Sequence, residues 1–373
     1  MKISFLSVFY PYRGGIAQFN ANLFNQLKRD HEVKIWNFTR QYPDFLFPGK
    51  SQFVDENDTA DAIPTVRTLD TINPLTWIKT ASQIKRFHPD ILLTRLWMPF
   101  FAPSLGFVAA SLRKTGTKTV ALLDNVIPHE VRPGDNALIQ YFLNRHDGFI
   151  VMSESVREDV LHFCPQANIL LKPHPIYSHF GEGVDCNEAR AKLRLPRNAK
   201  VLLFFGFIRQ YKGLDVLLHT MKHLPEDYHL VIAGEVYGDF KPYQDIITEN
   251  GLTDRVHNSI EYIEDVRVPL FFSAADLCVL PYRSATQSGI AQIAWHYHLP
   301  LLVAKVGGLA EMVEEDETGL IAHDVRPPGL ATKIQYYFDH NLKKQFSMNM
   351  AARRDRYSWT GFTENVVKFM QEL

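Results

Sequence analysis

Hydrophobic residues fall in short continuous runs along the chain, and stretches with helical spacing separate these runs. Ten runs predict strands, at residues 2–8, 32–38, 90–95, 118–124, 148–153, 200–208, 228–234, 259–263, 277–282 and 300–306. Runs that do not alternate with polar residues are typical of strands buried on both faces, as in a parallel sheet covered by helices.

The stretches between the runs repeat apolar residues at the i, i+3, i+4, i+7 spacing of an amphipathic helix. This spacing follows Gly14-Gly15, follows Lys212-Gly213, and recurs in the tail 357–373. Strand alternating with helix predicts an α/β fold with right-handed crossovers.

The sheet pattern restarts midway along the chain. A single core usually stops growing at about 250–300 residues, so 373 residues indicate two domains. The segment 172–198 contains three prolines and two glycines among many polar residues, which favours an interdomain connection. We expect two doubly wound, Rossmann-like domains facing a cleft, spanning 1–175 and 176–357.

The net charge and the cysteine content indicate which partners and which cellular setting to expect. The chain has 40 Lys and Arg against 41 Asp and Glu, a formal charge of -1, which argues against a nucleic-acid partner. Its three cysteines form no CxxC motif, so we expect neither disulfides nor a zinc site, and a reduced, cytoplasmic setting. The longest uncharged run, 96–112, predicts a buried helix, and peripheral membrane contact is the alternative.

Two loops have residues suited to a phosphorylated ligand. Gly14 and Gly15 lie between a predicted strand and helix, where the backbone can approach a ligand closely; an ordinary turn is the alternative. Gly206 ends another predicted strand, and Arg209 and Lys212 follow it. Two cations on a loop at the carboxyl end of a strand suit the oxygens of a diphosphate, although solvated surface residues would look the same in isolation.

The segment 280–308 predicts a helix N-terminus at Ser288-Gly289, just after Gln287. No acidic residue occurs between Asp276 and Glu311, so the free amides of this helix start would favour an anion. A simple Ser or Thr cap on a core helix is compatible with the same pattern.

Three further polar residues follow predicted strands in the first half. His129 and Asn125 lie in the loop after the strand at 118–124, and Arg95 ends the strand at 90–95. Open α/β sheets bind ligands at this edge. Structural or exposed roles are the alternatives for His129 and Arg95.

Taken together, these motifs resemble the retaining glycosyltransferases of the GT-B fold, family 4 or "group 1". The resemblance covers nearly the whole chain. It rests on the Gly14-Gly15 loop, the His129 loop and the elements GFIRQYKG, YHLVIAGE, AADLCVLPYRSATQSG and VGGLAEMVEEDETGLI.

The resemblance implies that a nucleotide-sugar donor binds mainly to the second domain and the acceptor, a carbohydrate or a lipid-linked sugar, to the first. The tail helix 358–373 would return to the first domain. Arg209 and Lys212 match the pair that neutralises the diphosphate, and His129 matches the active-site histidine. Other matches are the close-approach loop at Gly14 and Gly15, the phosphate and sugar loop from Gln287 through Ser288 and Gly289 to Ile290, and the nucleobase segment at Tyr262 and Ile263.

The chain departs from the family at its paired glutamates. None occurs around the predicted donor helix, where the nearest polar substitutes are Gln287 and Gln292. No Asp-x-Asp motif occurs either, so we expect no metal and no cofactor beyond the donor substrate. A nucleotide-sugar 2-epimerase and an inactive nucleotide-sugar-binding module remain the alternatives to a transferase.

Overall fold

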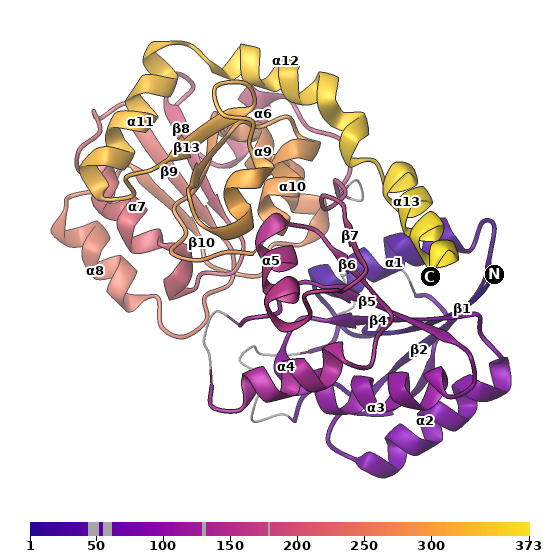
Figure 1. Ribbon diagram of the computed structural model, residues 1–373. Coiled ribbons are helices and arrows are strands. Elements are labelled where there is room, and N and C mark those ends of the chain that lie inside the picture. The colour runs from indigo at the N-terminus through magenta and orange to yellow at the C-terminus, as the bar shows by residue number, and fades with distance from the viewer. Residues whose placement is uncertain (44–51, 55–61, 129–131, 178–179, 287) are drawn as a thin grey trace. The chain divides into compact units, whose positions relative to one another are not determined.

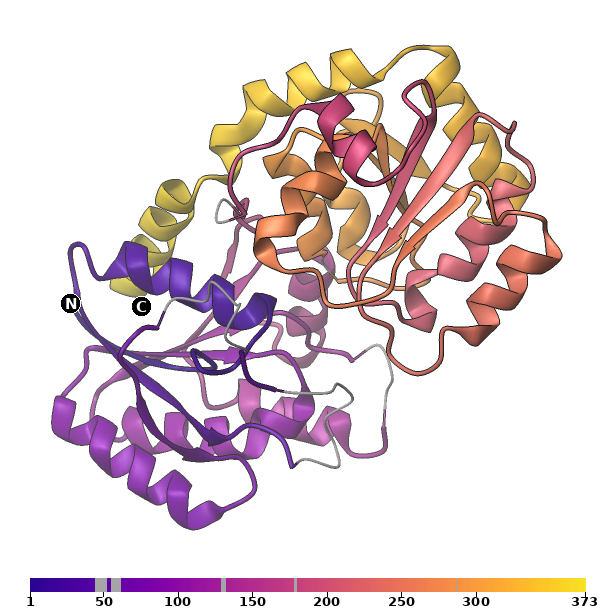
Figure 2. The same ribbon diagram turned by 180° about the vertical axis from the view of Figure 1, so that it is seen from behind.

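Figure 1 and Figure 2 show a computed structural model of the chain, built from two parallel sheets with helices between successive strands. It describes residues 1–43, 52–54, 62–128, 132–177, 180–286 and 288–373. The chain divides into two compact units: unit 1 contains Met1–Pro175 and Tyr357–Leu373, and unit 2 contains Ile176–Arg356. The α/β class with two Rossmann-like domains is thereby confirmed.

The sheet of unit 1 has the strand order β3-β2-β1-β4-β5-β6-β7, with neighbouring strands parallel. Its strands are β1 (Lys2–Leu6), β2 (Glu32–Arg40), β3 (Val66–Asp70), β4 (Ile91–Leu96), β5 (Lys118–Leu123), β6 (Gly148–Val151) and β7 (Ile169–Leu171). Its helices are α1 (Gly15–Leu27), α2 (Pro74–Phe87), α3 (Ala102–Arg113), α4 (Asp135–Leu143), α5 (Glu154–Phe163) and α13 (Trp359–Glu372), with a short 3₁₀ turn at Pro99–Phe101.

The last helix of the chain belongs to unit 1, where α13 packs against α1. The ring of Phe19 on α1 lies 4.9 Å from that of Trp359 and 5.8 Å from that of Phe362. A Cβ at Gly148 would lie 2.7 Å from Cδ1 of Leu373 and 2.8 Å from Cζ of Phe369, so α13 packs closely on the start of β6. The apolar spacing of the tail therefore buries aromatic residues in the first unit.

The sheet of unit 2 has the order β10-β9-β8-β11-β12-β13, again parallel. Its strands are β8 (Lys200–Phe205), β9 (Tyr228–Ala233), β10 (Val256–Ser259), β11 (Leu277–Leu280), β12 (Leu301–Ala304) and β13 (Gly319–Ala322). Its helices are α6 (Cys186–Lys192), α7 (Leu214–Met221), α8 (Lys241–Glu249), α9 (Val268–Ala274), α10 (Gly289–His296), α11 (Pro327–Asp339) and α12 (Lys343–Arg353). Its 3₁₀ turns are η3 (Gln210–Lys212), η4 (Asp265–Arg267), η5 (Gly307–Met312) and η6 (Arg354–Tyr357), whose last residue enters unit 1.

The strand predictions fail only at the sheet edges. The strands β3, β7 and β13 were not predicted, and each is an outermost strand. The predicted strand 259–263 is wrong: β10 ends at Ser259, and 260–263 form a loop. An outermost strand has one neighbour and is short or partly polar, so its sequence lacks the long apolar run of an inner strand.

Most of the apolar run 96–112 is a buried helix, as predicted, although Leu96 ends β4 and Met98 is exposed. It contains α3, most of whose residues are inaccessible to solvent, including Leu105, Val108 and Leu112. None of the helices among the described residues has both the length and the apolar character that a bilayer crossing requires.

Candidate functional site

The loop after β8 brings three of the predicted donor-site residues together. Gly206 follows the strand with a φ of 90°. A Cβ at this position would lie 2.8 Å from Cδ1 of Ile290 and 3.5 Å from Nζ of Lys212. Glycine therefore lets this backbone approach both the ammonium group and the first turn of α10.

Lys212 is a buried cation in this loop, with 8% of its surface exposed. Burial, and secondly the charge of Arg209, lowers the pKa of Lys212 to about 8. No carboxylate among the described residues contributes to this shift. A buried ammonium group without an acidic partner is unfavourable by itself, so this position favours the arrival of an anion.

Arg209 is oriented by an aromatic ring. Its guanidinium group lies over Tyr237, 4.3 Å from the ring centroid. The backbone N–H of Tyr237 donates to the carbonyl of Ile208 over 3.0 Å, which fixes the ring beside the loop. Stacking occupies the face of the guanidinium group rather than its N–H groups, which lie in its plane and suit phosphate oxygens.

Arg283, in the loop after β11, holds the backbone of the Arg209–Lys212 loop. The backbone N–H of Arg283 donates to the carbonyl of Tyr211 over 2.7 Å. Its side-chain Nη1 donates to the carbonyl of Gln210 over 2.6 Å. The same guanidinium group forms an ion pair with Asp215 on α7 at 2.6 Å. Sequence reasoning missed Arg283, although it lies within the quoted YRSATQSG motif.

A glycine completes the contact between these two loops. Gly213 has a φ of 70°, and a Cβ there would lie 2.2 Å from the carbonyl oxygen of Pro281. Only glycine combines this left-handed backbone with so close an approach. The loop with the two predicted phosphate-binding cations is thus held against the loop that leads to α10.

The start of α10 has no side-chain cap. Ser288 is the N-cap in an extended conformation, but its side chain forms no capping hydrogen bond. Gly289 is exposed, and the first turn contains no acidic residue. Because the first amides of a helix lack internal partners and lie at its positive end, this terminus suits an anionic oxygen.

Of the two glutamines that stand in for the paired glutamates, the structure describes Gln292. Gln292 is 1% exposed, and its Oε1 accepts no hydrogen bond from any described residue. Gln287 lies outside the described residues. The side-chain oxygen of Gln292 is therefore a buried acceptor that can still receive a hydrogen bond near the start of α10.

Tyr262 and Ile263 lie in the loop between β10 and the η4 turn. Ile263 is buried and Tyr262 is half-buried. The strand order β10-β9-β8 and the parallel pairing put this loop at the same sheet edge as Gly206. The predicted nucleobase segment and the predicted diphosphate loop thus share the carboxyl edge of one sheet.

In unit 1, the glycine pair lies where β1 leads into α1. Gly14 has a φ of 111°, and a Cβ there would meet no atom within 4 Å. Gly15 is the exposed first residue of the helix. Open space beside a left-handed backbone is what a close-approach loop requires. His129, the predicted active-site histidine, lies outside the described residues.

Arg95 has an internal role. Its side chain is 3% exposed and forms a two-pronged ion pair with Asp124, at 2.7 and 2.6 Å. Its Nη1 donates to Asn20 over 2.9 Å, and its guanidinium group lies 4.2 Å from the ring centroid of Phe19. We therefore assign Arg95 to positioning the loops of unit 1 rather than to direct acceptor contact. Asn125 follows Asp124, and its amide donates to the carbonyl of Trp97 over 3.4 Å.

Metal-binding clusters do not appear in the part of the chain that the structure describes: no three His, Cys, Asp or Glu side chains there gather around a common point. Cys164, Cys186 and Cys278 are free thiols.

Both units match glycosyltransferase families. Residues 185–355 match the family model described as "Glycosyl transferases group 1", and residues 13–176 match the one described as "Glycosyltransferase Family 4". The fold and the two matches together support a group 1 glycosyltransferase of the GT-B fold.

Relatives agree with this class. A D-inositol 3-phosphate glycosyltransferase of Xylanimonas cellulosilytica is 27% identical over 176 residues, which cover 46% of this chain and 42% of the relative. An uncharacterized glycosyltransferase of Methanocaldococcus jannaschii, MJ1178, is 23% identical over 100% of this chain and 99% of its own length. The solved structure of Anabaena Alr3699/HepE in complex with UDP superposes with a TM-score of 0.74 at 18% identity, over the full length of both chains.

Proposed function

We propose that the protein transfers a sugar from a nucleotide diphosphate sugar to an acceptor hydroxyl, with retention of the anomeric configuration. The acceptor is a carbohydrate or a lipid-linked sugar, in polysaccharide or glycoconjugate synthesis. The observation that supports this proposal most strongly is the convergence of Lys212, Gly206 and Ile290 at the start of α10, with Arg209 beside them.

In this proposal, the donor diphosphate binds to unit 2. Arg209 and Lys212 neutralise its charge, and the amides at Ser288-Gly289 donate hydrogen bonds to the oxygens of its distal phosphate. These groups stabilise the negative charge that grows as the bond from sugar to phosphate breaks. Alr3699/HepE, which has this fold, has been solved with UDP and with UDP-glucose, which supports a donor of that class.

Retention follows a front-face course in this proposal. No carboxylate occurs between Asp276 and Glu311, so no covalent glycosyl-enzyme forms on α10. The departing phosphate oxygen takes the proton of the acceptor hydroxyl as the new glycosidic bond forms. His129 and the Gly14-Gly15 loop act on the acceptor side, near the transferred sugar.

The test combines a donor panel with two substitutions. A thermal-shift panel of UDP-, GDP- and ADP-sugars identifies the base, and turnover of that donor is then measured. Arg209→Ala and Lys212→Ala each remove a charge-assisted bond, so turnover should fall by about 10–150-fold while the protein stays folded. Lys344→Ala, at an exposed position elsewhere in unit 2, is the matched control. Near-unchanged turnover in both site variants would exclude the assignment.

Product analysis separates the transferase from its alternatives. A glycosylated acceptor with release of the nucleoside diphosphate supports transfer. An epimerised sugar on an intact nucleotide, or binding with no release of the diphosphate, contradicts it.

A further inference from the structure

We propose that the N-terminal turn of α2 binds the surface of an anionic lipid bilayer. This turn contains three of the most exposed aliphatic side chains of unit 1: Ile72 is 47% exposed, Leu75 is 75% exposed and Ile78 is 56% exposed. We call these three residues the α2 apolar tip. Ile72 precedes the helix, and Leu75 and Ile78 lie in its first two turns; contiguous exposed apolar side chains of this kind mark interaction surfaces.

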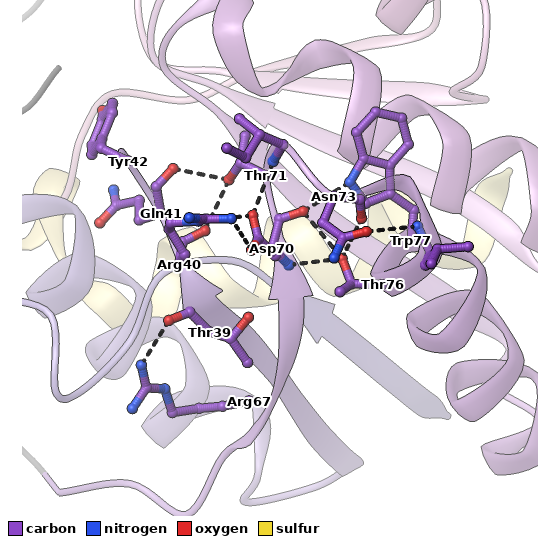
Figure 3. Close-up of polar contacts among 12 residues, drawn as sticks. Thr39, Arg40, Gln41, Tyr42, Arg67, Asp70, Thr71, Asn73, Thr76 and Trp77 are labelled. Atoms are coloured by element: carbon purple, nitrogen blue, oxygen red, sulfur yellow. Dashed lines mark hydrogen bonds and ion pairs between the residues drawn. The ribbon is translucent and has the colours of Figure 1, made fainter. Parts of the chain in front are cut away.

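The α2 apolar tip is held rigidly in its exposed position. Figure 3 shows the polar contacts around Asp70 and Asn73 that fix the end of β3 and the start of α2. Oδ1 of Asp70 accepts from the N–H of Ile72 over 3.1 Å, and Oδ1 of Asn73 accepts from the N–H of Leu75 over 3.1 Å. The hydroxyl of Thr76 donates to the carbonyl of Asn73 over 2.6 Å.

Two further contacts fasten this turn to the sheet. The indole N–H of Trp77 donates to the carbonyl of Asp70 over 2.8 Å, and Arg40 on β2 forms an ion pair with the Asp70 carboxylate at 2.5 Å. A turn so restrained presents its apolar side chains without the entropic cost of ordering them on binding.

The rest of the exposed face of α2 is basic. Lys79 and Arg86 are exposed and Lys85 is half-buried, and no acidic residue occurs between Asp70 and Asp90. In the described part of the chain, none of these three cations forms an ion pair with a carboxylate. The buried face of the helix, with Thr80, Ala81 and Ile84, packs on the unit and leaves this basic face outward.

Neighbouring elements extend the positive charge. α2 packs against α3, and Lys114 follows the last residue of α3, Arg113, which is itself paired with Asp147 at 3.0 Å. Figure 1 shows α2 at the outer margin of unit 1. It packs against the edge strand β3. Of the acidic residues near α2, Asp70 is already paired with Arg40, and Asp90 accepts from the N–H of Lys2.

These features fit a bilayer better than a protein partner. A helix that lies on a membrane inserts aliphatic side chains into the acyl boundary while lysine and arginine side chains contact anionic headgroups. The α2 apolar tip is aliphatic and is followed by Lys79 and Lys85, whereas protein interfaces are depleted in lysine. Membrane contact, the alternative for the run 96–112, is thereby moved to α2, since the α3 part of that run is buried.

Sedimentation of the full chain with lipid vesicles tests the proposal. We expect binding to vesicles of phosphatidylglycerol mixed with phosphatidylcholine in equal amounts, and little binding to phosphatidylcholine alone. The double variant L75S and I78S should lose about tenfold or more in affinity. Neutralising two cations, in K79Q with R86Q, should cost about 20-fold, and added salt should weaken binding of the unchanged protein.

Matched controls keep the result specific. Val266 and Met348 are 67% and 63% exposed in unit 2, so V266S with M348S removes comparable apolar surface elsewhere. K344Q removes a charge from an exposed position in the same unit. Both controls should bind like the unchanged protein.

Three results would overturn the proposal. These are the absence of binding to anionic vesicles, equal losses in the controls, and unchanged binding of L75S with I78S. Light scattering supplies a further outcome: a dimer that dissociates in L75S with I78S, without vesicle binding, would assign the surface to a second copy of the chain. Thermal melting of each variant confirms that it is folded.

Discussion

Arg283 and Asp215 form two hydrogen bonds, at 2.6 and 3.0 Å, that join the loop after β11 to the start of α7. The same guanidinium group donates to the carbonyl of Gln210 over 2.6 Å. One side chain thus fixes the loop between β8 and α7 from outside. The position of Arg209 and Lys212, at either end of Gln210–Tyr211, therefore depends on a residue that does not itself line the proposed diphosphate site.

Replacing Arg283 with alanine should weaken nucleotide binding more than it weakens folding. The variant loses the guanidinium bonds to the Gln210 carbonyl and to Asp215, which loosens the loop, so we expect affinity for the nucleoside diphosphate to fall by about tenfold. The Arg283 side chain is 43% exposed, so the thermal midpoint should change little. Arg283→Lys should stay impaired because an ammonium group lacks the planar fork. Calorimetric titration measures the affinities.

Arg326 offers the matched control for this prediction. It forms an exposed ion pair with Asp324 elsewhere in unit 2. Arg326→Ala should bind nucleotide like the unchanged protein. Equal losses in Arg283→Ala and Arg326→Ala would contradict the positioning role.

Nucleotide affinity should fall as pH rises above about 8. Burial and Arg209 lower the pKa of Lys212 to about 8 in the free protein. A bound diphosphate favours the charged ammonium group and so raises that pKa, which means that affinity is full below about 8. Above it, affinity falls by up to about tenfold per pH unit as the free protein loses the proton.

Lys212→Arg is the control for the pH dependence, because arginine stays charged throughout this range. Titrations of the nucleoside diphosphate between about pH 7 and about pH 9 should show a decline in the unchanged protein and a flatter profile in the variant. Identical profiles would mean that Lys212 does not contact the ligand in its charged form.

The ring of Tyr237 should support diphosphate binding through Arg209. Tyr237→Leu removes the stacked ring, and we expect diphosphate affinity to fall by about two- to fivefold. Tyr237→Phe retains the ring and should bind like the unchanged protein. A loss in Tyr237→Phe as large as in Tyr237→Leu would point to the hydroxyl group instead.

Turnover should survive removal of divalent metal. The sequence contains no Asp-x-Asp motif, and Arg209 and Lys212 supply positive charge where a metal ion would otherwise act. Turnover is measured after exhaustive EDTA treatment, with and without added magnesium or manganese. Activity that disappears on chelation and returns with one of these ions would refute the purely cationic account.

Most inner strands could be predicted because their sequences are mainly apolar. β4, with all six residues buried, and β8 are examples. The edge strand β3, VRTLD, could not, since it has polar residues and one neighbour. Local periodicity detects burial on both faces, whereas an edge strand depends on pairing that only the folded sheet supplies.

Local sequence also predicted some residues of the candidate site and missed others. Gly206, Arg209, Lys212 and Ser288 were predicted because each lies next to a predicted strand or helix end. Arg283 and Tyr237 were missed because they act on other loops through contacts distant in sequence. One signal was available: Arg283 and Lys305 are the two Lys or Arg residues between Asp276 and Glu311.

Acid should destabilise unit 1 through His146. This side chain is buried, with Nδ1 2.9 Å from the carbonyl oxygen of Phe142 and Nε2 3.0 Å from the hydroxyl of Thr94. A neutral ring that donates to the carbonyl and accepts from the hydroxyl satisfies both contacts. Burial lowers the pKa of His146 to about 4, against about 6.5 in the unfolded chain.

The sign of the effect follows from proton uptake. Below about pH 6.5 the unfolded chain binds a proton at His146 that the folded protein excludes, so the free energy of unfolding falls with pH until about pH 4. His146→Gln preserves a donor and an acceptor without titrating. The free energy of unfolding of this variant should therefore fall less steeply on acidification. The two slopes should differ by about 1.4 kcal/mol per pH unit between about pH 6.5 and about pH 4.

Urea unfolding followed by tryptophan fluorescence measures the free energy of unfolding, since unit 1 contains Trp36, Trp77, Trp97 and Trp359. His219→Gln, at an exposed position, should keep the parental slope, and parallel slopes for all three proteins would show that His146 does not control the acid response.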